Sequence, residues 1–151
     1  MAEPLSLPPV PAPPKGERLK NKVVLLTGAA QGIGEAIVAA CASQQAKLLI
    51  SDIQAEKVEQ VAAHWREQGY DVQALKADVS RQQDLHAMAK RAVELHGRID
   101  VLVNCAGVNV FRDPLEMTEE DWRGLTPLIY HHVNPYGRIE LNMDQRLALA
   151  A

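Results

Sequence analysis

An α/β fold built on a parallel sheet is predicted by the way apolar residues are spaced along the chain. From residue 20 onward, short aliphatic runs alternate with longer stretches of helical period, as in strands joined by crossover helices. The first run, residues 22–27, is almost continuously apolar and predicts a central strand covered on both faces. Further strands are expected at residues 47–52, 72–77 and 99–104.

Helices are expected between these strands, because apolar residues recur there at helical spacing. Gly69 and Gly97 are expected to end the second and third helices, and Ser80 to be the N-cap of the third. Thr118 is expected to cap a short later helix, with Asp121 three residues on. The residues expected on the buried helix faces are Ile33, Ile37, Val38 and Cys41, then Val58, Val61, Ala62 and Trp65, then Leu85, Met88, Ala89, Ala92 and Val93.

The two ends of the chain differ in character from this central part. Six prolines fall within the first fourteen residues, and they fix φ and remove backbone donors, so residues 1–18 are expected to be a disordered proline-rich arm. After Arg123 the alternation of strands and helices fails. Residues 124–151 are therefore expected to be an atypical tail with one short edge strand at 138–143, attached to a folded part at 19–123.

Composition narrows the range of functions. The 151 residues are 47% hydrophobic, which suits one domain with a real core, and the formal net charge of −3 offers no broad basic surface for nucleic acid. No apolar run approaches the ~20 residues that a membrane-spanning helix needs, and the first sixteen residues do not read as a secretory signal. A cytoplasmic protein that binds small molecules is the expectation.

No metal site is expected. Cys41 and Cys105 lack the spacing of a zinc site and are interpreted as buried thiols that pack in the core. The adjacent pair His131 and His132 is interpreted as ordinary loop histidines, because neighbouring side chains point in different directions and no third ligand is visible.

A glycine-rich turn, Thr27-Gly-Ala-Ala-Gln-Gly-Ile-Gly34, follows the first expected strand and opens the first expected helix. In that position glycines let the backbone turn sharply and approach a pyrophosphate, while the helix N-terminus offers free N–H groups and a positive dipole end. A purely structural turn is the alternative, since glycine turns are common. The turn therefore points to a phosphate-binding loop only together with further features.

Asp52 supplies one such feature, because it ends the second expected strand. A carboxylate there can accept both ribose hydroxyls of an adenosine, whereas a 2′-phosphate would meet a like charge. Gln31 and Ile53 offer no compensating cation, so NAD is favoured over NADP. Asp52 also suits a second role, capping the helix that starts near Gln54, and the two roles are compatible.

Asp78-Val79 and Asn104-Cys-Ala-Gly107 follow the third and fourth expected strands, so they share the carboxyl edge of the sheet with the glycine turn. Together these motifs resemble those of classical short-chain dehydrogenases/reductases over about residues 19–123. The resemblance implies a Rossmann-like doubly wound parallel sheet, here truncated after the fourth strand. It assigns cofactor binding to Gly28, Gln31, Gly32, Ile33, Gly34, Asp52, Ile53, Asp78, Val79, Asn104, Ala106 and Gly107.

The resemblance also implies an NAD-dependent oxidoreductase that transfers a hydride between NAD and an alcohol or carbonyl, with residues 108–113 hinting at sugars or polyols. That chemistry needs a serine, a tyrosine and a lysine four residues after the tyrosine. The chain has no serine after Ser80 and no lysine after Lys90, and Asn134 and Glu140 stand four residues after its late tyrosines. No catalytic residue is assigned, and turnover is expected to be absent or very slow.

Three functional hypotheses follow: an active dehydrogenase, a catalytically silent NAD-binding module, or a non-functional remnant whose tail is unrelated or frameshifted. The fourth strand is expected to be an apolar sheet edge in all three. Self-association or aggregation through that edge is expected unless the tail or another chain covers it.

Overall fold

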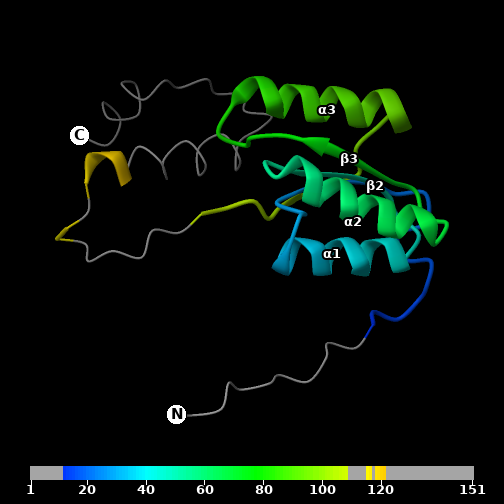
Figure 1. The fold of residues 1–151 in the computed structure, drawn as a ribbon. Helices are drawn as coiled ribbons and strands as arrows, with labels where there is room; N and C mark the ends of the chain where they lie inside the picture. The colour runs from blue at the N-terminus through cyan, green and yellow to red at the C-terminus, as the bar shows by residue number, and fades with distance from the viewer. Residues whose placement is uncertain (1–11, 109–114, 117, 122–151) are drawn as a thin grey trace, which may run out of the picture.

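The computed structural model describes residues 12–108, 115–116 and 118–121, and within them strands and helices alternate in the predicted order (Figure 1). The chain order is β1, α1, β2, α2, β3, α3 and β4. The bounds are β1 Val23–Thr27, α1 Gly32–Ser43, β2 Lys47–Asp52, α2 Ala55–Glu67, β3 Val72–Lys76, α3 Gln82–His96 and β4 Val101–Asn104. None of the described helices is long and apolar enough to cross a membrane.

The four described strands form one parallel sheet in the order β3-β2-β1-β4. All five residues of β1 are buried, which confirms the central strand predicted from its apolar run. Leu25 lies between Leu49 of β2 and Leu102 of β4. The predicted α/β class and Rossmann-like order are confirmed, and β4 lies at the edge of the described sheet.

Alternate residues of the strands pack into two separate cores. Val24 and Leu26 pack with apolar residues of α1 and α2, whereas Leu25 and Leu49 pack with Leu85 and Met88 on the side of α3. Figure 1 shows α1 and α2 on one side of the sheet and α3 on the other. Because successive side chains of a strand point to opposite faces, the central strands must be apolar throughout.

Two residues of the predicted helix faces are exposed instead. Ile33 is 77% exposed, because it lies in the first turn of α1 at the carboxyl edge of the sheet. Val93 is 49% exposed on α3 and borders a shallow groove with Val101 of the edge strand β4. Helical period identified the right elements, but it did not show where the sheet beneath them ends.

Other sequence predictions also need correction. Arg81, and not Ser80, is the N-cap of α3, because the Ser80 hydroxyl donates to Asp78 Oδ1 at 2.6 Å instead. Cys41 and Cys105 are only half-buried, and Cys105 lies just after the end of β4. The capping contact at Thr118 is confirmed, since Thr118 Oγ1 accepts the Asp121 N–H at 3.2 Å and the Thr118 N–H donates back to Asp121 Oδ2 at 2.8 Å.

Part of the segment expected to be a disordered arm, residues 14–18, makes hydrogen bonds to the end of α1. The Gly16 N–H donates to Ser43 O at 2.9 Å, and Gln44 Nε2 donates to Pro14 O at 2.6 Å. The last carbonyl groups of a helix have no helical partners, and the Gly16 N–H satisfies one of them, Ser43 O. Residues 1–11 and 122–151, including the expected edge strand at 138–143 and His131-His132, lie outside the described residues.

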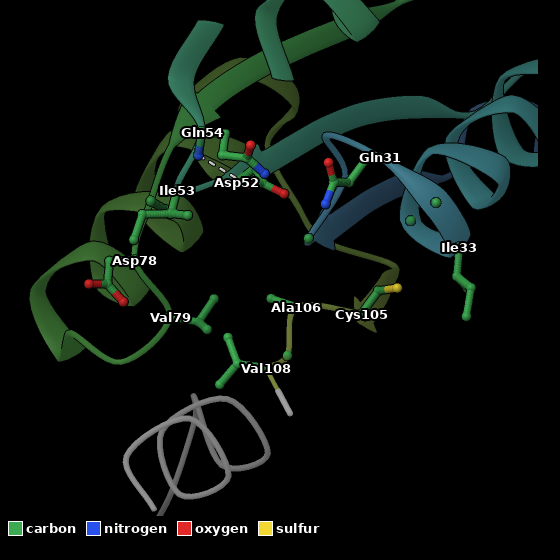
Figure 2. A pocket seen from close by; sticks show the side chains of 15 residues that line it. Gln31, Ile33, Asp52, Ile53, Gln54, Asp78, Val79, Cys105, Ala106 and Val108 are labelled. Carbon is green, nitrogen blue, oxygen red and sulfur yellow. Dashed lines mark hydrogen bonds between the residues drawn. The ribbon is translucent and has the colours of Figure 1, made fainter. Parts of the chain in front are cut away.

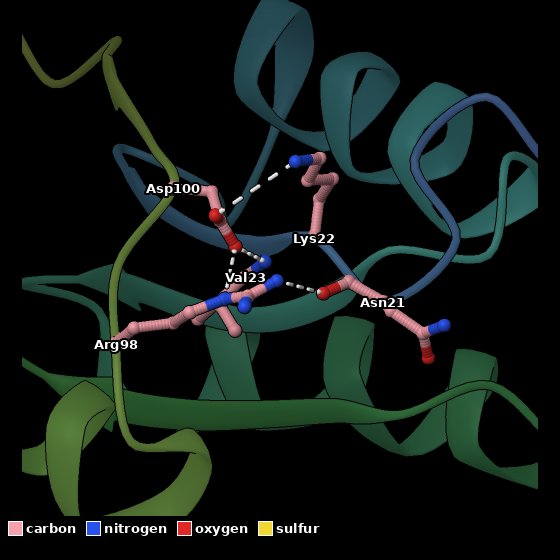
Figure 3. Close-up of polar contacts among 5 residues, drawn as sticks. All are labelled: Asn21, Lys22, Val23, Arg98 and Asp100. Carbon is pink, nitrogen blue, oxygen red and sulfur yellow. Dashed lines mark hydrogen bonds and ion pairs between the residues drawn. The ribbon is translucent and has the colours of Figure 1, made fainter.

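An ionic cluster fixes the start of β4 against the start of β1 (Figure 3). Asp100 Oδ2 accepts the Val23 N–H at 2.8 Å and Arg98 Nε at 3.0 Å, while Arg98 also donates to Asn21 O at 3.0 Å. Lys22 Nζ lies 4.0 Å from Asp100 Oδ1. The hydrogen bond from Val23, supported by Arg98 and Lys22, holds the pKa of Asp100 below its ordinary value.

We predict that Asp100→Asn lowers stability at neutral pH but not in acid. A carboxyl whose pKa is lowered by folding adds to the free energy of unfolding. This contribution is fully present above the pKa of the unfolded state, about 4, and is lost as the pH falls through the lower pKa of the folded state. Urea unfolding at a series of pH values should therefore show a constant gap between the two proteins at pH 5–7 that closes below about pH 4. Glu67→Gln, an equal charge change at the exposed end of α2, is the control. A gap that persists unchanged in acid would contradict the assignment.

Candidate functional site

A cleft of about 470 Å³ opens at the carboxyl edge of the sheet (Figure 2). The loops after β1, β2, β3 and β4 all contribute to its lining. In open α/β sheets this edge is where ligands bind, because the loops that connect strands to helices converge there.

Two glycines of the turn that borders the cleft pack so closely against protein backbone that they have no room for a side chain. A Cβ on Gly28 would lie 2.5 Å from both the Cα and the N of Ala106, and a Cβ on Gly34 would lie 1.8 Å from Gly28 O. The N-cap Gln31 makes no side-chain cap hydrogen bond. The first turn of α1 therefore presents uncapped N–H groups and a positive dipole end to the cleft, an arrangement suited to an anion.

The buried hydroxyl of Thr27 ties the glycine turn to the loop that follows β4. Thr27 is 1% exposed, and its Oγ1 accepts the N–H groups of Cys105 and Ala106, each at 3.2 Å. The same hydroxyl lies 3.5 Å from Val103 O, to which it donates. One side chain at the end of the central strand thus fixes one wall of the cleft relative to the other.

Asp52 lies between the two helix starts that border the cleft. Its Oδ2 accepts the Ala30 N–H at 3.1 Å and its Oδ1 accepts the Gln54 N–H at 3.0 Å. Figure 2 shows Asp52 between Gln54 and Gln31. The expected capping role of Asp52 is wrong, because Gln54 is the N-cap of α2 and Asp52 accepts the N–H of that residue two positions on. The two hydrogen bonds hold the carboxylate in place at the cleft.

Asp78 is held by the start of the segment leading to α3. Its Oδ1 accepts both the N–H and the hydroxyl of Ser80, at 2.9 and 2.6 Å, and its Oδ2 lies 3.5 Å from Arg81 Nε. The hydrogen bond from the Ser80 hydroxyl is the main cause that lowers the pKa of Asp78 below its ordinary value. Asp78 is therefore a fixed anion at neutral pH.

Apolar side chains line the cleft beside these polar groups. Ile33, Ile53 and Val108 are 77%, 59% and 63% exposed, and all three border it. Large exposed aliphatic residues gathered in one hollow are typical of a surface that a ligand covers.

The structure brings eleven of the twelve residues predicted for the site to the lining of this cleft. Asn104 is absent from the lining, because it is the last residue of β4 and pairs with Thr27. The sequence analysis missed four lining residues, Gln54, Ala77, Cys105 and Val108. Each of the four is next to a predicted residue in the sequence, so adjacency to the motifs was the signal that could have found them.

No group of histidines, cysteines and carboxylates suited to a metal occurs among the described residues.

The family model for short chain dehydrogenase matches residues 22–140, which include every strand and helix of the sheet described above. This chain belongs to the short-chain dehydrogenase family. The match runs beyond Arg123, where the motifs recognised in the sequence end. The protein is thus a family member with the fold that its motifs predicted.

The relatives of this chain agree with that membership. Oxidoreductase UcpA of Salmonella typhimurium is 42% identical over 104 residues, which cover 69% of this chain and 39% of the relative. A short chain dehydrogenase/reductase from Burkholderia phymatum, solved in complex with NAD, is 28% identical in sequence and superimposes with a TM-score of 0.75. The match covers 78% of this chain and 42% of the Burkholderia phymatum chain. A relative from Brucella melitensis titled glucose/ribitol dehydrogenase has 30% identity and a TM-score of 0.74, with 80% of this chain and 50% of that chain covered. The chain thus spans well under half the length of the curated relative.

We predict that Thr27→Val destabilises the protein by roughly 1 kcal/mol, because it keeps the side-chain volume but leaves the part-buried N–H groups of Cys105 and Ala106 without their acceptor. Urea unfolding followed by circular dichroism measures this loss. Thr27→Ser keeps the hydroxyl and serves as the control, with a smaller loss expected from its missing methyl group. If Thr27→Val were as stable as the unmodified protein, the hydroxyl would not be the link between the two loops.

Proposed function

We propose that the chain binds NAD in the cleft at the carboxyl edge of the sheet and does not itself catalyse hydride transfer. The observation that carries this proposal is the glycine turn. Gly28 and Gly34 pack against protein backbone and let the turn fold tightly, Gly32 has nothing within 4 Å of an added Cβ, and the uncapped start of α1 borders the same cleft. A pyrophosphate needs such close backbone approach and such N–H donors.

The rest of the cleft fits the remaining parts of a dinucleotide. Asp52, fixed by the N–H groups of Ala30 and Gln54, suits the ribose hydroxyls of the adenosine and favours NAD over NADP. Ile53 and Val79 line the cleft on the same side and offer apolar surface to a base. The likeness to a Burkholderia phymatum family member solved with NAD supports this choice of cofactor.

NAD would supply a hydride acceptor when bound, and the residues of this chain would bind and orient it. The family acts on alcohols and carbonyls, and the likeness to a relative titled glucose/ribitol dehydrogenase supports a sugar or polyol as the substrate class. The serine, tyrosine and lysine expected for proton transfer have no counterpart in the sequence, since no lysine follows Lys90 and no serine follows Ser80. The alternative, an active dehydrogenase, is favoured by the family membership alone.

We predict that Gly32→Asp weakens NAD binding at least about tenfold, because it places a carboxylate where the pyrophosphate binds and an L side chain at a positive φ. Gly32 has a φ of +59° and nothing within 4 Å of an added Cβ. Titration calorimetry with NAD measures the change in Kd.

Gly69→Asp is the matched control for that variant. Gly69 also has a positive φ, of +87°, and open space around its Cβ, but it follows α2 and is not part of the cleft lining. The control carries the same strain and the same charge, so it should bind NAD like the unmodified protein. Equal weakening by both variants would remove the support for a pyrophosphate at the glycine turn.

We also predict that the purified chain forms no NADH above background with a panel of secondary alcohols, sugars and polyols, followed by absorbance. A phenol with a pKa near ~10 needs a nearby cation to act at neutral pH, and no lysine follows either late tyrosine at the family's spacing. An intact family member provides the positive control. Steady turnover by this chain would establish the alternative, an active dehydrogenase.

A further inference from the structure

Lys57 is not one of the residues that line the cleft, but it contacts the lining residue Gln31 next to Asp52. It lies in the first turn of α2, and its Nζ donates to Gln31 Oε1 at 3.2 Å. Gln31 lines the cleft and precedes α1, so this hydrogen bond joins the starts of the two helices that flank Asp52. Nothing in the sequence spacing indicated this cation, because Lys57 and Gln31 are 26 residues apart.

The charge of Lys57 is not cancelled by a direct partner. Both oxygens of Asp52 accept backbone N–H groups, and no ion pair joins Lys57 to a carboxylate among the described residues. Glu56 is the other charged residue in this turn of α2; it is exposed and outside the cleft lining, as Lys57 is, and within the described part of the chain it forms no hydrogen bond or ion pair with Gln31 or Lys57. An ammonium has three N–H donors, and the contact with Gln31 uses one of them.

We propose that Lys57 determines how strongly the cleft discriminates between NAD and NADP. Asp52 repels a 2′-phosphate, and the exposed ammonium of Lys57 on the facing helix start attracts it. The flexible four-carbon side chain allows the ammonium to leave Gln31 for a phosphate oxygen. The cleft therefore tolerates NADP better than the carboxylate of Asp52 alone would allow. This inference rests on the proposed binding of a nicotinamide dinucleotide.

A purely structural role for Lys57 makes a different prediction. If its only role were to position Gln31 at the glycine turn, removing the charge would change the binding of both cofactors to the same extent. The ratio of the two dissociation constants separates these roles, because only an interaction with the 2′-phosphate distinguishes NADPH from NADH.

The test compares Kd for NADH and for NADPH, measured by the fluorescence of the reduced nicotinamide, in the unmodified protein and in Lys57→Gln. We expect the Kd for NADPH to rise about fivefold while that for NADH changes less than about twofold, and we expect the effect to shrink as salt is added. Lys90→Gln is the matched control, since Lys90 is an exposed lysine on α3 that pairs with Glu94 at 3.8 Å, away from the cleft. It carries the same change in net charge and should leave the ratio unaltered.

The other outcomes would overturn either the role of Lys57 alone or the proposed function as a whole. Equal weakening of both cofactors by Lys57→Gln, or no change in either, would overturn the specificity role of Lys57 and leave NAD binding intact. An equal change of the ratio in Lys57→Gln and Lys90→Gln would assign the effect to net charge and would also overturn it. If the unmodified protein bound neither cofactor, the proposed function would fail, and the role of Lys57 with it.

Discussion

The close approach of the β1 turn to the loop after β4 is the constraint on which the rest of this site depends. Gly28 lies against the backbone of Ala106 so tightly that a Cβ would come within 2.5 Å of it, and the Thr27 hydroxyl holds the N–H groups of Cys105 and Ala106 beside it. At the opposite end of the same two strands, Asp100 holds Val23. With both ends fixed, β4 is in register with the central strand, and the loops that follow β1 and β4 form facing walls of one cleft.

The strands were predictable because a parallel sheet imposes a simple pattern. A strand covered on both faces has to be apolar along its whole length, which is why β1 and β2 were visible in the sequence. The departures came from tertiary context. Ile33 continues the helical period, yet it lies at the edge of the sheet where nothing in the described part of the chain covers it. Ser80 has the side chain of an N-cap, but the carboxylate of Asp78 takes its hydroxyl.

The site was predictable to the extent that its parts follow strands. The glycine turn, Asp52 and Asp78 each come after a strand of a parallel sheet, so the sequence alone placed them at one edge, and the structure brings them to the same cleft. Contacts between side chains of different helices could not be deduced in this way. The bond between Lys57 and Gln31 depends on how α1 and α2 lie side by side, which no spacing in the sequence encodes. Cys105 was expected in the core and instead lines the cleft.

The central claim is that the described strands and helices bind NAD on their own, although the chain lacks the serine, tyrosine and lysine that catalysis in this family needs. Thermal unfolding of the purified chain, with and without saturating NAD, tests it most directly. A ligand that binds only the folded state must raise its stability, so the account predicts one cooperative transition that moves to higher temperature with NAD and does not move with nicotinamide alone. A cooperative transition indifferent to NAD, or the absence of any transition, would contradict it.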